Sequence, residues 1–91
     1  MVHPDIQRHT LDPRLGQILR AERMRRWHTL QSLADEVGVS KRTICYLQNG
    51  ERAPSVTVAY RILDVLGVDP ATGWGALFIA AAVPDVGKDR H

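Results

Sequence analysis

Residues 29–50, TLQSLADEVGVSKRTICYLQNG, decide the fold of this chain. The first part of the stretch carries apolar residues at the spacing of one helix face, and these are Leu30, Leu33, Ala34 and Val37. Thr29 precedes them as an N-cap candidate. Gly38 follows them where the helix must reverse, because glycine takes the left-handed conformation without steric cost. We therefore predict a short helix between Thr29 and Gly38.

A second helix follows at once and presents a polar outer face. Ser40 is an N-cap candidate for a helix over 41–48, and Asn49-Gly50 ends it in a turn. Ile44 and Leu47 would face the core. The opposite face carries Lys41, Arg42, Cys45, Tyr46 and Asn49. Cationic and amide donors on an exposed helix suit guanine edges and phosphate groups, so this helix is the candidate functional element.

The remaining segments complete an all-α fold of five short helices. Helical periodicity predicts a first helix over 14–26, a fourth from the capping residue Ser55 to Gly67, and a fifth from Asp69-Pro70 to about Val83. Residues 1–13 lack periodicity and are predicted to be a flexible or loosely docked arm, and residues 84–91 a solvated tail. One domain over 14–83 is expected, with residues 70–83 as its last helix.

Charge is distributed unevenly along the 91 residues. The formal net charge is only +2, but residues 14–52 carry eight Lys or Arg against four acids, a net of +4, and the remainder is net −2. The basic segment contains the two central helices. The single cysteine, Cys45, excludes an internal disulfide. No signal peptide is recognisable, and no apolar run reaches the roughly 20 residues of a membrane span, so we expect a cytoplasmic protein.

Enzymatic function is not expected. The sequence contains no Ser/His/Asp grouping, glycine-rich phosphate loop or pair of carboxylates at helical spacing that stands out. His3, His9, His28 and His91 show no metal-ligand spacing with one another or with Cys45, so no metal, cofactor or small-molecule ligand is predicted. Two neighbouring cations would favour the Cys45 thiolate, but an inert thiol is the simpler interpretation.

The stretch that begins at Leu15, LGQILRAERMRRWHTLQSLADEVGVSKRTICYLQNGERAPSVTVAYRILDVLGVD, resembles the Cro/CI-type (XRE-like) helix-turn-helix family of phage and bacterial regulators. The resemblance extends to about residue 69 and rests on many positions in register. Like residues stand at Arg23, Thr29, Leu33-Ala34, Gly38-Val39-Ser40, Thr43-Ile44, Asn49-Gly50, Pro54 and Leu66-Gly67-Val68. The resemblance implies a lambda-repressor-like fold that binds double-stranded DNA.

The resemblance also implies residue roles. The helix over 41–48 would be the recognition helix, with base readout by Lys41, Arg42 and Tyr46. Backbone and positioning contacts would come from Thr29, Gln31, Ser40, Thr43, Asn49 and Arg52. Cations at a helix N-terminus oppose the helix macrodipole, so Lys41 and Arg42 are better explained by DNA contact than by stability.

Three positions depart from the family pattern. Leu30 stands where the family usually has a glutamine that grips a phosphate, and Gln31 is displaced from it by one residue. Gln48 replaces the usual glutamate, so Arg23 would keep a hydrogen bond but lose its charged partner. Trp27-His28 replaces a common Gly-Leu pair, so the first turn must be built differently, with the aromatic ring facing solvent or packed on the N-terminal arm.

The last predicted helix is apolar nearly all round. One stripe consists of Trp74, Leu77, Phe78 and Ala81, and the other faces are apolar as well. A domain of this size offers little core for a second apolar face, so a homodimer through the stripe is expected, with packing under the N-terminal arm as the alternative. Two copies would hold two recognition helices about 34 Å apart, which matches half-sites one turn apart on a duplex.

The predicted function is a nucleoid-associated, sequence-specific regulator, a dimeric repressor that occupies a palindromic operator. The alternative is a protein-binding adaptor or antitoxin, in which the helix-turn-helix is a scaffold and the apolar last helix docks a partner protein. Leu30 supports the alternative, since it removes a side chain that would bind a phosphate.

Overall fold

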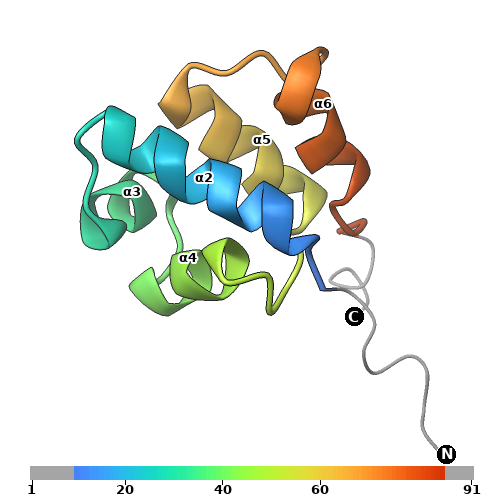
Figure 1. Ribbon diagram of the computed structural model, residues 1–91. Helices are drawn as coiled ribbons and strands as arrows, with labels where there is room; N and C mark the ends of the chain where they lie inside the picture. Colours follow the sequence, from blue (N-terminus) through green and yellow to red (C-terminus); the bar gives the residue numbers. More distant parts are fainter. Residues whose placement is uncertain (1–9, 86–91) are drawn as a thin grey trace, which may run out of the picture.

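The computed structural model describes residues 10–85, and that range contains five helices and no β-sheet (Figure 1). The helices are α2 (Pro13–Arg25), α3 (Leu30–Val37), α4 (Lys41–Gln48), α5 (Val56–Leu66) and α6 (Gly73–Ala80). α2 packs on α4 and α6, while α5 packs on α3 and α6. Figure 1 shows α4 below α2, with α5 behind them. The predicted all-α class is confirmed, and residues 10–85 contain five helices, the number predicted.

The core lies where the five helices meet, and the stripes recognised in the sequence supply it. Its buried members include Leu15, Leu19, Leu33, Ala34, Val37, Ile44, Leu47, Ala59, Ile62, Leu63, Leu66 and Phe78. Helices of eight residues are too short to be stable alone in water, so packing holds them: each buried leucine-sized side chain contributes roughly 1.5–3 kcal/mol. None of the described helices combines the length and apolar character that crossing a membrane requires.

Gly16 allows α2 and α4 to approach closely. A Cβ at this position would lie 2.6 Å from the carbonyl oxygen of Gln48 and 2.8 Å from that of Leu47. Both distances are shorter than van der Waals contact, so only glycine lets the backbone of α2 lie against the end of α4. The sequence marks Gly16 merely as a weak helix former, whereas in the fold it fixes α4 against the domain.

Four helix ends close with the same backbone hydrogen bond, in which an N–H donates to the carbonyl five residues earlier. The donor–acceptor pairs are His28–Arg23, Val39–Ala34, Glu51–Tyr46 and Val68–Leu63. The residue before each donor is left-handed, and these residues are Trp27, Gly38, Gly50 and Gly67, with φ of 60°, 90°, 78° and 71°. The three glycines lie where the sequence predicts helix ends, and Trp27 occupies the same conformation without being a glycine.

The N-terminal boundary of the domain differs from the prediction. Asp12 caps α2 by accepting a hydrogen bond from the Arg14 N–H at 2.9 Å, and Pro13 is the first helical residue. Leu11 is only 1% exposed and belongs to the core. The end of the predicted arm over 1–13 is therefore part of the domain, because Leu11 has an apolar surface to bury. Residues 1–9 lie outside the described range.

The last helix is shorter than the predicted 70–83. The Asp69 carboxylate accepts from the Ala71 N–H at 2.8 Å and from the Thr72 hydroxyl at 3.4 Å, which closes a turn rather than starting a helix. Gly73 has a φ of 57°, outside the right-handed helical region, so a helix cannot run through it from Pro70. α6 accordingly begins at Gly73 and ends at Ala80.

The segment after α6 returns to the start of α5. The Val83 N–H donates to the Pro54 carbonyl at 2.9 Å, and the Val83 carbonyl accepts from the Val56 N–H at 2.9 Å. An Asp85 oxygen accepts from the Thr57 N–H at 3.3 Å. The second residue of the predicted solvated tail over 84–91, Asp85, therefore contacts the fold, and residues 86–91 lie outside the described range.

Candidate nucleic-acid interface

α4 carries the predicted base-reading side chains on an exposed face. The Ser40 hydroxyl accepts from the Thr43 N–H at 3.1 Å, which starts the helix at Lys41. Ile44 and Leu47 are fully buried and fix the rotation of the helix about its axis. Lys41 and Arg42 are exposed as a result, and within residues 10–85 neither forms an ion pair. Both cations are thus available to a ligand.

Tyr46 lies half-buried one turn after Arg42 on the same helix. The guanidinium carbon of Arg52 lies 4.7 Å from the centre of the Tyr46 ring, which is a cation–π contact. This contact ties the polar loop after α4 back to the helix. Arg52 is consequently held beside the exposed face of α4, where the sequence analysis expected a positioning residue.

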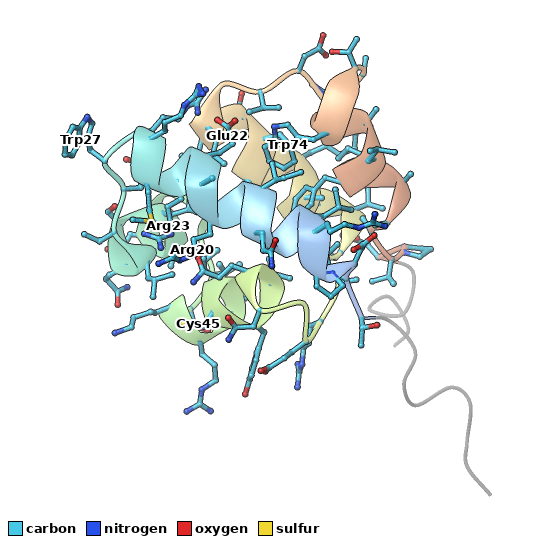
Figure 2. The ribbon with its side chains drawn as sticks, viewed as in Figure 1. Arg20, Glu22, Arg23, Trp27, Cys45 and Trp74 are labelled. Carbon is cyan, nitrogen blue, oxygen red and sulfur yellow. The ribbon has the colours of Figure 1, made fainter. Side chains whose placement is uncertain are left out.

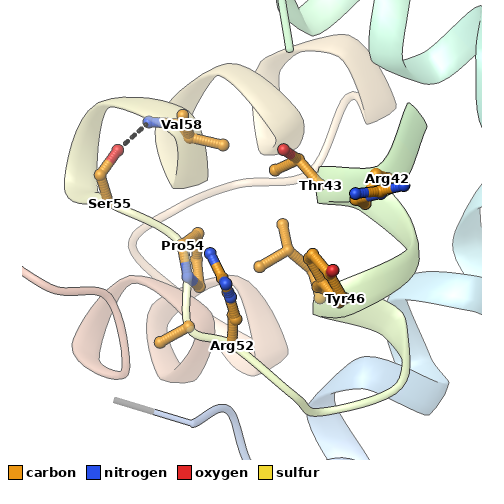
Figure 3. Close-up of a pocket in the computed structure, with 9 residues that line it drawn as sticks. Arg42, Thr43, Tyr46, Arg52, Pro54, Ser55 and Val58 are labelled. Carbon is orange, nitrogen blue, oxygen red and sulfur yellow. Dashed lines mark hydrogen bonds between the residues drawn. The ribbon is translucent and has the colours of Figure 1, made fainter. Parts of the chain in front are cut away.

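A groove of about 380 Å³ runs between α4 and the start of α5 beside this pair (Figure 3). Arg42, Thr43, Tyr46 and Arg52 line it, and all four are among the predicted DNA contacts. Sequence reasoning missed the facing wall, which is built from Ala53, Pro54 and Val58. In the sequence Pro54 is only a family match, and no local signal places Pro54 or Val58 opposite Tyr46.

Cys45 is a half-buried free thiol on the outer face of α4 and is labelled in Figure 2. It lines a shallow surface hollow together with Lys41, Arg42 and Tyr46. Among the described residues, no group of three or more His, Cys, Asp or Glu side chains is arranged to hold a metal ion. Cys45 is a neighbour of the side chains predicted to read bases.

The start of α3 is built from a reciprocal cap. The Thr29 hydroxyl accepts from the Ser32 N–H at 2.9 Å, and the Ser32 hydroxyl accepts from the Thr29 N–H at 2.9 Å. The Gln31 amide donates to the Asp35 carboxylate at 2.8 Å, one turn along the same helix. Leu30 is half-buried and packs against the core. An apolar role thus replaces the phosphate-binding glutamine that the family usually has at this position.

The other predicted positioning residues lie at the two ends of α4. Ser40 and Thr43 share a hydroxyl–hydroxyl hydrogen bond of 3.0 Å at its start, and Asn49 is the exposed C-cap at its end. Together with Thr29 and Gln31 on α3, they border the base-reading face and form no single cluster.

Arg23 is the buried charged residue of the described chain, at 8% exposure. Its Nε donates to the Gln48 side-chain oxygen at 3.3 Å, and its Nη1 donates to the His28 carbonyl at 2.8 Å. Burial lowers the pKa of Arg23, and repulsion by Arg20 lowers it further. The predicted hydrogen bond to Gln48 is confirmed, and within residues 10–85 no carboxylate pairs with Arg23.

Trp27 projects from the turn between α2 and α3 and is 91% exposed (Figure 2). The sequence allowed a ring that faces solvent or one that packs on the N-terminal arm. Within residues 10–85 the ring faces solvent. Met24, one turn earlier, is also half-exposed. The turn therefore carries two apolar side chains that its own fold does not bury.

The predicted dimer stripe on α6 divides into buried and exposed residues. Phe78 is fully buried in the core of its own chain, so its placement at a dimer interface is corrected: no surface of this side chain is left for a partner. Trp74 is half-buried and packs edge-on against Phe78, with ring centroids 5.6 Å apart. Ala81 is half-buried, whereas Leu77 is 60% exposed.

Leu77 borders an apolar groove of about 610 Å³ between α2 and α6. Ile18, Ala80 and Ala81 line its floor, and Asp12 and Arg14 form an ion pair at its rim, 3.0 Å apart. Ile18 and Ala80 were not among the predicted interface residues. Only the position of α6 against α2 shows that Ile18 borders this groove.

Comparison with known proteins agrees with the helix-turn-helix geometry. The sequence model of the helix-turn-helix family matches residues 19–72, which include α3, α4 and α5 and end before α6. A protein of Methanothermobacter thermautotrophicus, named as an uncharacterized HTH-type transcriptional regulator, is 38% identical over 50 residues. That alignment covers 55% of this chain and 72% of the relative. The family match contains all the predicted DNA-contact residues and none of the predicted dimer contacts.

Proposed function

Because the chain belongs to the XRE-like helix-turn-helix family, we propose that it is a sequence-specific repressor that binds a palindromic operator in double-stranded DNA as a homodimer. Its family and its relative support the broader function of a DNA-binding transcription regulator. The observation that carries the proposal is the pair of exposed cations, Lys41 and Arg42, on the first turn of α4. Their positive charge is unfavourable near the positive end of the helix dipole. Contact with DNA phosphates or bases would explain why the cations lie there.

α4 enters the major groove in this proposal, since a helix fits that groove and can read base edges there. Arg42 and Lys41 donate to guanine, whose O6 and N7 both accept. Tyr46 contacts the neighbouring base pair from the next turn of the helix. Arg52, stacked on Tyr46, reaches the DNA backbone beside it.

The backbone contacts come from both sides of α4. Ser40 and Thr43 lie at its start and Asn49 at its end. The Thr29 hydroxyl accepts the capping hydrogen bond and still has its own proton to donate to a phosphate. One amide N–H of Gln31 already donates to Asp35, so we assign it the weakest contact of the six.

The homodimer uses the groove between α2 and α6. Leu77 is the exposed apolar side chain at this site, with Ala81 and Trp74 beside it. The rim carries one acid and one base, Asp12 and Arg14. They form an ion pair with each other, so the apolar side chains carry the isologous contact in this proposal. Leu77→Lys should convert a dimer to a monomer in light scattering while the monomer stays folded, because Leu77 is outside the core.

Selection from a pool of random duplexes tests the proposal. The purified chain should enrich one palindrome, with an affinity that falls steeply as salt rises. Arg42→Ala should weaken binding to that duplex by about 1–3 kcal/mol and relax the base specificity at one position of the site. Arg25→Ala removes the same charge from the end of α2 and serves as the control. Equal losses on selected and random duplexes would reassign Arg42 to phosphate contact, and a flat salt response would exclude DNA as the ligand.

A protein-binding adaptor or antitoxin is the second candidate, favoured by Leu30 and Leu77. The first packs into the core where a phosphate-binding glutamine is usual, and the second is exposed on α6. This candidate would be favoured if the chain enriches no duplex and is a monomer that aggregates through the exposed side of α6. A stable dimer that enriches a palindrome would exclude it.

A further inference from the structure

The groove beside Tyr46 combines charged, hydroxyl-bearing and apolar side chains. Arg42 and Arg52 lie at its edge, and Pro54 and Val58 form the wall opposite Tyr46 (Figure 3). Its volume of about 380 Å³ is ample for a methyl group and the edge of the ring that carries it. The position next to two predicted base-reading residues makes it part of the surface that a major groove would meet.

Two of the three side-chain hydroxyl groups that line this groove, those of Ser55 and Thr43, form hydrogen bonds within the protein. The Ser55 hydroxyl accepts from the Val58 N–H at 3.2 Å, as the dashed line in Figure 3 shows. The Thr43 hydroxyl is bonded to that of Ser40 at 3.0 Å. Beside these hydroxyl groups, the groove presents the apolar side chains of Ala53, Pro54 and Val58 and the ring of Tyr46. Such a surface recognises apolar groups, and the guanidinium groups at the rim attract an anionic polymer that carries them.

We propose that this groove receives the C5-methyl group of a pyrimidine, in thymine or 5-methylcytosine, on the major-groove edge of the operator. This inference rests on the proposed function. The C5-methyl is the apolar group that the major-groove edge of DNA exposes. Arg42 holds the neighbouring base pair or phosphate, and the Arg52–Tyr46 stack keeps one wall in place. Val58 and Pro54 supply the apolar contact on the other wall.

The inference is tested by removing or adding single methyl groups in the duplex that selection enriches. Each thymine is replaced in turn by deoxyuridine, which removes the methyl group and keeps every hydrogen-bonding group. One position in each half-site should lose about fourfold in affinity, the effect expected for one buried methyl group. Where that position is a cytosine, 5-methylcytosine should instead bind about fourfold more tightly. The two arms distinguish the two sources of the methyl group.

Two matched variants locate the methyl contact on the protein. Val58→Thr keeps the side-chain shape but adds a hydroxyl in the groove, so the ratio of affinities with and without the methyl should fall towards one. Val56→Thr makes the same change on the same helix outside the groove lining, and should keep the ratio. Because a ratio is measured on one folded variant at a time, modest loss of stability does not affect it.

The outcomes separate this inference from the function on which it rests. If a palindrome is enriched but no methyl group changes affinity at any position, DNA binding stands and the methyl site is wrong. If a methyl effect exists and Val58→Thr leaves it unchanged, the methyl is read elsewhere on the protein, which also overturns the assignment. If no duplex is enriched at all, the proposed function fails and this inference fails with it.

Discussion

The two turns that bound α3 share one plan. Each consists of a left-handed residue, one linking residue and an N-cap, in the segments Trp27-His28-Thr29 and Gly38-Val39-Ser40. In both, the linking residue donates its N–H to the carbonyl five residues earlier, at 3.1 Å in the first turn and 3.0 Å in the second. The backbone therefore adopts the same turn on both sides of α3.

The side chains at the two turns differ. Gly38 adopts its φ of 90° at no cost, whereas a residue with a Cβ, such as Trp27 at 60°, loses about 1–2 kcal/mol in this region. The first turn has a compensating contact, since buried Arg23 donates to the His28 carbonyl at 2.8 Å. The second has a longer one, from exposed Arg61 to the Val37 carbonyl at 3.4 Å. One turn relies on a permissive residue and the other on a buried cation.

Among the variants at these two turns, Arg23→Ala should have the largest effect on the stability of the domain. Removing a buried guanidinium that bonds two oxygens should lower the free energy of unfolding by about 2–3 kcal/mol, measured by urea denaturation. Arg61→Ala is the matched control at the other turn, and should cost less than about 1 kcal/mol because its donor is exposed and its bond long. Equal losses would mean that the two turns depend on their cations to the same extent, contrary to the comparison.

Gly38→Ala should have the next largest effect. A Cβ here meets only Arg61 Nη1, at an ordinary 3.5 Å, so the expected loss of about 1–2 kcal/mol in the free energy of unfolding comes from the backbone alone. Gly67→Ala tests this directly, since Gly67 is also left-handed and nothing lies within 4 Å of its would-be Cβ. A loss at position 38 well above that at position 67 would point to crowding between α3 and α5.

Local rules made much of this fold predictable. Thr29, Ser40 and Ser55 were expected as N-caps, and each accepts a capping hydrogen bond from an N–H three residues later. Such signals depend on a few neighbouring residues. The outer face of α4 was predictable for the same reason, since Ile44 and Leu47 fix its rotation.

Features that depend on distant segments were not predictable. Phe78 is buried because α6 lies on α2 and α5, and its own helix pattern cannot reveal this, since the helix is apolar on every side. The groove beside Tyr46 exists because α5 begins next to α4, which places Val58 opposite a residue 12 positions earlier. The need for glycine at position 16 likewise becomes visible only when α4 lies against α2.

Trp27→Gly should have the smallest effect, and of opposite sign. Glycine relieves the left-handed strain but gains freedom in the unfolded chain, so a net increase in the free energy of unfolding of up to about 1 kcal/mol is expected, measured by urea denaturation. Trp27→Ala keeps a Cβ at the same φ and should leave stability nearly unchanged. If the alanine variant gains as much as the glycine variant, the gain comes from removing a ring that is 91% exposed, and the backbone conformation is not strained. A gain with glycine alone would show that the left-handed conformation at position 27 is strained for a residue with a Cβ.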